Sequence, residues 1–469
     1  MNSELISAID NLIEKYTDKI AKDTINLVNI KSVQEEAEPG APFGRGPKMV
    51  LDTILDMGNE AGLFCTDFNV GVISLALKDA TPDLGIWIHG DVVAEGEGWN
   101  FEPYNATEYK GCIIGRGATD NKGQFSAIFN LFKIFKELNV SLDYNPAIYV
   151  GSNEESGMKD LVGIPENPDA KGFLNVATPP KLSLVPDSSF PLGYGGKGGM
   201  TLVLRSESPL RGFSLIAGQD DAPGNAVAIF DRTDIPDSLP ECTVSKDTKA
   251  TVTTFSPPKH GAHPDPNGNM ITQISSALLD ADLVHEDDTK TIEFLRIVSS
   301  DIYGKALGIE TNHEIMGPLT VFSKRVDSVD GYCDFHINIR YPLGITYEKI
   351  VENVEKAAKD FGFVIAKKIR GTSPYILDPN SSIAKELTAV ANSVTGDDKQ
   401  PTTISGGTYA HFLPNAYVYG MNGNLPPDDF PKGRGGAHGV DECVSLERLK
   451  RAMRIYARAL LRLNEITWD

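Results

Sequence analysis

The sequence predicts an α/β protein in which a second domain, of α+β type, is inserted into the first. Over residues 1–193, short apolar runs typical of buried strands alternate with amphipathic helical segments. Over 194–371, strand-like segments accompany two expected helices, and over 372–469 the chain returns to long helices. We therefore predict one domain made of 1–193 and 372–469, with 194–371 inserted into it.

The first part of the chain contains three helical segments and three short apolar runs. The helical segments carry apolar side chains on one face, and the apolar runs have the length of strands buried on both sides. In chain order, these elements are expected at 4–31 (helix), 47–62 (helix), 72–77 (strand), 84–88 (strand), 122–138 (helix) and 147–150 (strand). The strand, helix, strand order indicates a layered α/β domain.

The run at 193–199 is too rich in glycine for a strand interior, so we expect a hinge or a crossing point there. The elements beyond it are separated by turn residues. Strands are expected at 201–204, 251–255 and 333–340, and helices at 270–284, 347–361, 382–395 and 445–464.

Composition excludes several classes of partner. The 469 residues include 44 Lys and Arg against 64 Asp and Glu, a net charge of −20, which disfavours binding to nucleic acid or to an anionic membrane. The chain has no apolar run long enough for a transmembrane helix, and its first residues lack the pattern of a signal peptide. The five cysteines are scattered and form no CxxC pair, so we expect free thiols and a cytoplasmic location.

Ionisable side chains follow the apolar runs at 84–88, 147–150 and 182–184, and two more lie in glycine-rich loops. Each alone is consistent with a polar turn or a helix cap. Together they place imidazoles and carboxylates where α/β proteins bind ligands, and this donor set suits a pair of divalent ions better than a structural zinc, which prefers cysteines. The residues are His89, Asp91, Glu154, Glu155 and Asp187 after the runs, and Asp120 and His438 in the loops. The donor set consists of His89, Asp120, Glu155, Asp187 and His438.

These motifs, taken in order, resemble those of the M20 family of zinc metallopeptidases, and in particular its PepV-like dipeptidases (Xaa-His dipeptidase, carnosinase-like). The resemblance covers nearly the whole chain and implies an M20-type architecture, in which 194–371 is a lid domain on a zinc-peptidase-like catalytic domain. The motifs are His89-Gly90-Asp91-Val92-Val93, Gly115-Arg116-Gly117-Ala118-Thr119-Asp120-Asn121-Lys122-Gly123, Glu154-Glu155, Pro186-Asp187 and the late His438.

The resemblance implies two Zn²⁺ ions, with Mn²⁺ or Co²⁺ as substitutes. Asp120 would bridge them, His89 and Asp187 would complete one site, and Glu155 and His438 the other. By the same resemblance, the catalytic residues are Asp91, which supports His89, Glu154, which acts as general base for a water bridging the zinc ions, and His263, which polarises the scissile carbonyl.

The implied substrate is a dipeptide with a free C-terminal carboxylate, and the implied enzyme is a monomeric dipeptidase. Arg340 and the loop Gly406-Gly407-Thr408 would hold that carboxylate, and Asn225 would touch the substrate. A guanidinium suits a carboxylate because its donors form a bidentate fork.

The sequence departs from the family pattern at Ala94, at Asn121 and in the loop 216–226. These departures concern substrate preference more than the proposed ligands. Three alternatives remain: an M20 deacylase acting on N-acyl or N-succinyl amino acids, a non-catalytic relative that binds metal or peptide, and an interaction scaffold without metal.

Overall fold

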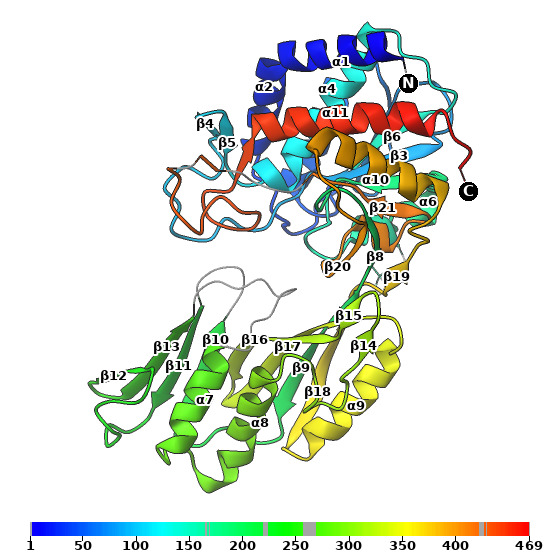
Figure 1. Ribbon diagram of the computed structural model, residues 1–469. Helices are drawn as coiled ribbons and strands as arrows, with labels where there is room; N and C mark the ends of the chain where they lie inside the picture. Colours follow the sequence, from blue (N-terminus) through cyan, green and yellow to red (C-terminus); the bar gives the residue numbers. More distant parts are fainter. Residues whose placement is uncertain are drawn as a thin grey trace. The chain divides into compact units, whose positions relative to one another are not determined.

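Two separate hydrophobic cores divide the chain into two compact units. The first unit comprises Met1–Gly195, Ile376–Thr402 and Thr408–Asp469, and the second comprises Gly196–Tyr375 and Thr403–Gly407. The computed structural model describes residues 2–164, 167, 169–218, 224–256, 269–421, 426–427 and 429–468. The predicted α/β class is confirmed, since each unit combines a sheet with helices (Figure 1).

The first unit is built on a nine-stranded sheet in the order β1-β2-β6-β3-β7-β21-β8-β19, with β20 beside β8. Its central strands β6, β3 and β7 are parallel and buried along their whole length, as the continuous apolar runs predict. The bounds are β1 Phe64–Asp67, β2 Val72–Ala76, β3 Leu84–His89, β6 Pro146–Gly151, β7 Leu182–Val185, β8 Gly193–Gly196, β19 Tyr375–Ile376, β20 Thr402–Ile404 and β21 Ala416–Val418.

Helix α4 packs against α1, α2 and α11 in this unit (Figure 1). The long helices are α1 Ser3–Lys15, α2 Thr17–Val28, α3 Arg45–Glu60, α4 Gly123–Glu137, α10 Ser382–Thr395 and α11 Leu446–Leu463, with short helices α5 Lys159–Val162 and α6 Phe173–Val176. A small sheet of β22 (Cys443–Ser445), β5 (Cys112–Ile114) and β4 (Thr107–Tyr109) completes the unit.

The prediction of one helix over 4–31 is wrong, because the chain breaks at Tyr16 into α1 and α2. The Tyr16 side chain is 6% exposed, and its hydroxyl donates to Glu137 Oε2 on α4 at 2.8 Å. The helical periodicity continues across the break, so the break was not visible in the sequence pattern.

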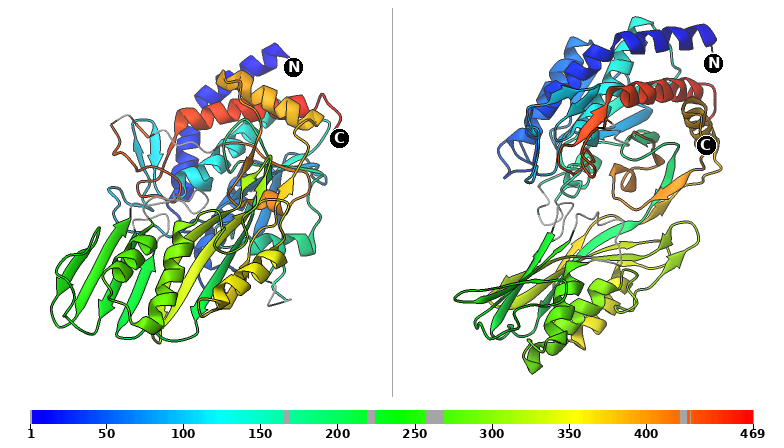
Figure 2. Two further views of the ribbon diagram at one scale, coloured as in Figure 1. Left: turned by 60° about the horizontal axis from the view of Figure 1, so that its bottom comes forward. Right: turned by 60° about the vertical axis from the view of Figure 1, so that its left-hand side comes forward.

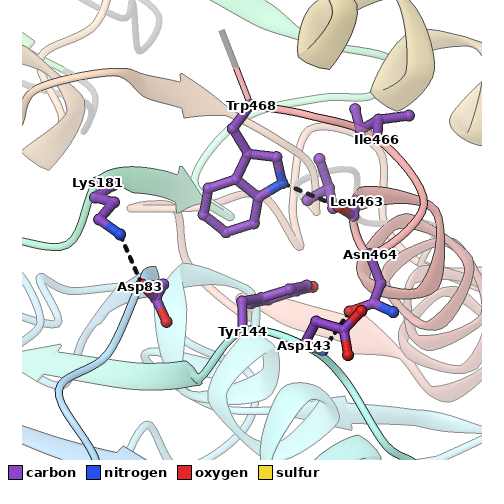
Figure 3. A pocket seen from close by; sticks show the side chains of 8 residues that line it. All are labelled: Asp83, Asp143, Tyr144, Lys181, Leu463, Asn464, Ile466 and Trp468. Atoms are coloured by element: carbon purple, nitrogen blue, oxygen red, sulfur yellow. Dashed lines mark hydrogen bonds and ion pairs between the residues drawn. The ribbon is translucent and has the colours of Figure 1, made fainter.

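A cavity of about 230 Å³ lies at the amino ends of β3, β6 and β7 (Figure 3). The C-terminal segment forms one wall, where the Trp468 ring meets Tyr144 edge-on at 4.9 Å and Trp468 Nε1 donates to the Leu463 carbonyl. Asp83, Asp143 and Lys181 line it from the residues that precede the three strands.

The second unit contains an eight-stranded antiparallel sheet in the order β12-β13-β11-β10-β16-β17-β9-β18. Its helices α7 (Met270–Asp280), α8 (Thr289–Ser300) and α9 (Tyr347–Lys359) lie on one face of the sheet (Figure 2). The strands are β9 Gly198–Ser206, β10 Phe213–Gly218, β11 Gly224–Phe230, β12 Thr243–Lys246, β13 Ala250–Ser256, β16 Thr320–Val329, β17 Tyr332–Tyr341 and β18 Phe363–Arg370, with a short pair β14 Asn312–His313 and β15 Gly317–Pro318.

The expectation that the glycine-rich run 193–199 lies outside strands is wrong, because it forms β8 and the start of β9. A side chain at Gly198 would come within 2.5 Å of the Tyr341 ring, and one at Gly199 within 2.6 Å of Arg340 Nη1. The glycines therefore allow the large side chains of β17 to lie across β9.

Candidate metal centre

The predicted ligands of the first unit converge at the carboxyl ends of its parallel strands. His89 is the last residue of β3, Glu155 lies in the turn after β6, and Asp187 follows β7. Because the three strands are parallel, these ends share one edge of the sheet. Asp120 reaches this edge from η1 (Ala118–Lys122), a turn whose backbone is extended at Asp120, and His438 from the loop before β22.

Asp120 lies at the middle of the cluster. Its Oδ1 is 3.0 Å from His89 Nε2, and its Oδ2 is 3.2 Å from His438 Nε2. His438 Nε2 is also 3.1 Å from Glu155 Oε1. The donor atoms form two groups, His89 with Asp120 and Asp187, and Asp120 with Glu155 and His438, and within each group they lie within 4.8 Å of one another. Asp120 therefore belongs to both groups.

The electrostatics of the cluster favour bound cations. Burial, followed by the negative charge of Asp120, raises the pKa of Asp187 to about 8. Burial, followed by the charge of Asp187, raises the pKa of Glu154 well above its usual range. Divalent cations would stabilise the ionised carboxylates, so this set of buried and half-buried imidazole and carboxylate donors fits a metal centre.

Burial alone would lower the pKa of His89, but the hydrogen bond to Asp120 and the surrounding carboxylates hold it well above its usual value. For Asp120 the opposite holds. Burial alone would raise the pKa of this carboxyl group, but the contacts with His438 and His89 hold it well below its usual range. The raised pKa of His89 and the lowered pKa of Asp120 therefore have a shared cause, the contact between these two side chains.

Asp91 organises both the first ligand and the next turn. His89 Nδ1 lies 3.0 Å from the Asp91 backbone carbonyl and 3.7 Å from its carboxylate, so the carbonyl accepts a hydrogen bond from Nδ1–H and Nε2 faces Asp120. The two carboxylate oxygens of Asp91 accept the backbone N–H groups of Glu154 and Glu155, each at 3.1 Å. Burial raises the pKa of Asp91 to about 7.

Asn121 connects the Asp120 loop to a second ligand. Its Nδ2 donates to Asp187 Oδ1 at 3.1 Å and to the Pro186 carbonyl at 3.3 Å. Both neighbours are acceptors, so the amide nitrogen must face them. The peptide bond between Asp120 and Asn121 is cis. The departure from the family pattern at Asn121 thus places a neutral donor beside the Asp187 carboxylate.

Sequence reasoning missed Asp160, a fully buried residue that supports the Glu154 turn. Its Oδ2 accepts the backbone N–H groups of Ser152 and Asn153 at 2.8 and 3.0 Å, and the Tyr409 hydroxyl at 2.5 Å. No motif surrounds Asp160 in the sequence, and its partner Tyr409 is 249 residues away. Only the tertiary structure reveals its contacts.

The remaining predicted residues belong to other segments of the chain. Arg340 is half-buried on β17, Asn225 is exposed on β11, and Gly406 and Gly407 belong to the short second segment of the second unit. Thr408 belongs to the first unit, where its hydroxyl accepts the Ala410 N–H at the start of a 3₁₀ turn, η3 (Tyr409–His411). His263 lies outside the described residues.

An α/β unit with a cluster of imidazoles and carboxylates at the carboxyl ends of parallel strands is typical of metal-dependent hydrolases. The sequence profile of Peptidase family M20/M25/M40 matches residues 85–462, and the chain belongs to this family. The M20 resemblance inferred from the motifs is thereby confirmed. None of the described helices has the length and apolar character needed to span a bilayer.

The chain is similar over its length to curated relatives. "Putative dipeptidase SSP1012" of Staphylococcus saprophyticus is 26% identical, with 96% of this chain and 98% of the relative covered. A Staphylococcus aureus protein with the same description, SAB1611c, is 24% identical with the same coverage.

Two solved structures share the fold. Human carnosine dipeptidase 1 has a TM-score of 0.59 at 15% identity, with 98% of this chain and 100% of that chain covered. The di-peptidase Dug1p of Saccharomyces cerevisiae has a TM-score of 0.61 at 14% identity, with 98% and 99% covered.

Proposed function

We propose that this protein is a dipeptidase that uses two zinc ions to hydrolyse dipeptides with a free C-terminal carboxylate. The observation that carries the proposal is the position of Asp120, whose two carboxylate oxygens face two different histidines in two donor groups. Membership of the peptidase family and the similarity to the staphylococcal relatives support the choice of reaction.

In this proposal, His89 and Asp187 hold one ion, Glu155 and His438 hold the other, and Asp120 contributes to both. Imidazole and carboxylate donors suit Zn²⁺, Mn²⁺ and Co²⁺, of which Zn²⁺ binds most tightly. When bound, divalent ions polarise a carbonyl oxygen and lower the pKa of water at the site to about 7.

Glu154 is proposed as the general base. Its side chain is 8% exposed, and Oε1 has no hydrogen-bond partner among the described residues. Burial and the charge of Asp187 raise the pKa of Glu154, which makes its carboxylate a stronger base. In this role Glu154 would accept a proton from water and donate it to the leaving amine. Asp91 would keep the Glu154 turn in place through its two backbone hydrogen bonds.

The substrate contacts are assigned by the motif resemblance and by side-chain chemistry. Arg340 would bind the C-terminal carboxylate through its paired N–H donors, together with Gly406, Gly407 and Thr408. Asn225 would contact the substrate. His263 would donate to the carbonyl oxygen as charge develops on it, where one donor contributes about 2.7–4 kcal/mol.

We also propose a monomer located in the cytoplasm. All five cysteines are free thiols, which is typical of a reducing compartment. Light scattering and subcellular fractionation would test these two points independently of the chemistry.

The central experiment combines metal analysis with a substrate panel. Purified protein should contain about two equivalents of divalent metal, hydrolyse dipeptides, and lose activity in a chelator until Zn²⁺ is restored. N-acetyl and N-succinyl amino acids serve as the matched panel, since they keep the carboxylate but lack the free α-amino group. Hydrolysis of these compounds in place of dipeptides would contradict the proposed substrate class, and absence of bound metal would contradict the mechanism.

A further inference from the structure

A buried ion pair joins the two loops that supply Asp120 and His438. Glu442 is fully buried and Arg116 is 1% exposed, and Arg116 Nη1 donates to Glu442 Oε2 at 2.7 Å. The two residues are 326 positions apart. Neither carries a role in the chemistry proposed above.

Glu442 accepts hydrogen bonds from three backbone N–H groups at the start of the turn that presents Asp120. Its Oε1 accepts the N–H groups of Thr119 and of Asp120 itself at 2.9 and 3.0 Å, and Oε2 accepts that of Gly117 at 3.1 Å. With Arg116 included, the two carboxylate oxygens accept four donors. Hydrogen bonds to a charged group are stronger than neutral ones, so this carboxylate fixes the backbone of Asp120.

Arg116 reaches the other loop with its second nitrogen. Nη2 donates to the backbone carbonyl of His438 at 3.0 Å and to that of Glu95 at 3.2 Å. The guanidinium plane therefore connects Glu442 to the backbone of His438. A planar fork with several donors can do this, whereas a lysine ammonium is a single point charge.

We propose that Glu442 and Arg116 are positioning residues that hold Asp120 and His438 at the separation required to bind two divalent ions. Their side chains would act through the backbone of the two ligands, as partners of metal ligands commonly do. The inference rests on the proposed metal centre and adds residues to it.

The chain offers a closely matched control one residue away. Asp441 is also fully buried, and its carboxylate accepts the N–H of Asn100, the side-chain amide of Asn100, the N–H of Phe101 and a nitrogen of Arg434. Arg434 also donates to the Gly98 carbonyl at 2.7 Å. This second pair is in the same loop as His438, yet its hydrogen bonds go to residues 98–101 in place of the Asp120 turn.

The test compares Glu442→Gln with Asp441→Asn in the full-length protein. Zn²⁺ affinity and stoichiometry are measured by isothermal titration, the geometry by the visible spectrum of the Co²⁺ form, and folding by thermal unfolding in chelator. Glu442→Gln should weaken ion binding about 10–100-fold and alter the Co²⁺ spectrum, while the metal-free protein still unfolds cooperatively. Asp441→Asn should change the Zn²⁺ affinity less than about threefold. This should hold even if Asp441→Asn lowers the unfolding temperature as much as Glu442→Gln does.

A second pair of variants separates the two contacts of Arg116, one with the Glu442 carboxylate and one with the His438 carbonyl. Arg116→Lys keeps a positive charge beside Glu442 but loses the hydrogen bond to the His438 carbonyl. It should therefore reduce the Zn²⁺ affinity of the site that contains His438 more than that of the other site. Arg434→Lys is its control and should weaken neither. If Glu442→Gln fails to fold, the comparison of Arg116→Lys with Arg434→Lys tests the inference: equal Zn²⁺ affinities in these two variants would overturn it.

Equal loss of affinity in Glu442→Gln and Asp441→Asn would overturn the inference, because it would mean that general loop stability is responsible. Unchanged Zn²⁺ binding in Glu442→Gln would also overturn it, while the metal centre itself would stand. If the wild-type protein bound no divalent ion, both the proposed metal centre and this inference would fall together.

Discussion

The two ends of the parallel strands in the first unit differ in what their side chains do. At the carboxyl ends, buried carboxylates crowd around two histidines, and several of them have strongly shifted pKa values. At the amino ends, Trp468, Tyr144 and an exposed ion pair between Lys181 and Asp83 surround a cavity (Figure 3). At the carboxyl ends, neighbouring carboxylates repel one another, and bound cations would relieve this repulsion. The amino ends contribute to stability mainly through packing.

The largest expected effect is that of Glu154→Ala at the carboxyl end. Turnover of a dipeptide should fall about 10²–10⁴-fold, because the group that moves the proton is removed. Zn²⁺ content should stay at the wild-type value, since Glu154 is not among the proposed ligands. Steady-state kinetics and metal analysis test both statements, and Glu154→Gln controls for the cavity left by alanine. Full activity in either variant would refute the role as general base.

The next effect is a pH dependence of the metal-free protein. The raised pKa values of Asp91 and Asp187, about 7 and about 8, mean that the folded state binds more protons than the unfolded state. Their contribution to stability is therefore present below about pH 4 and is lost as pH rises to about 8. The raised pKa of His89 also makes stability fall with rising pH, in the range above the ordinary pKa of histidine.

Urea unfolding in chelator at pH 5 to 8 measures this dependence. The free energy of unfolding should fall with rising pH in the wild type, and Asp187→Asn should flatten that slope. Saturating Zn²⁺ should remove the decline. A stability that rises with pH in chelator and is unaffected by Asp187→Asn would contradict the proposed electrostatic repulsion.

Trp468→Ala probes the amino ends. The variant loses the edge-on contact with Tyr144 and part of the packing of the C-terminal segment. The free energy of unfolding should decrease by about 1–2 kcal/mol. Zn²⁺ affinity should not change, because the cavity lies at the opposite end of the strands. A loss of metal affinity comparable to that of a ligand variant would break the distinction between the two ends.

The smallest effect is expected for Lys181→Ala. The Lys181 side chain is 80% exposed and pairs with Asp83 at 3.1 Å. Exposed ion pairs contribute about 0–1 kcal/mol, so the unfolding free energy should change by less than about 0.5 kcal/mol. Denaturant titration at low and high salt tests this. A larger loss would show that the amino ends also depend on charge.

Much of the fold was predictable because helical and strand periodicity is local. The helix predicted over 382–395 coincides with α10, and the phenylalanine-rich segment predicted over 122–138 corresponds to α4. Helix α8 and strands β10, β11 and β16 were missed, and the break at Tyr16 was not foreseen. Tyr16, where the first helix ends, contacts Glu137, which is 121 residues away, and periodicity carries no information about such a contact.

The sequence by itself determined the types of donor, their order and the family, because short motifs around His89, Asp120 and Glu155 record the local backbone that these side chains require. Only the tertiary structure decided which atoms meet. His438 lies beside Glu155 across 283 residues, and Glu442 caps the Asp120 turn across 322. The physical reason is that such contacts depend on the parallel order of β6, β3 and β7 and on the pairing of β22 with β5, and pairing between distant strands leaves no periodic signal along the chain.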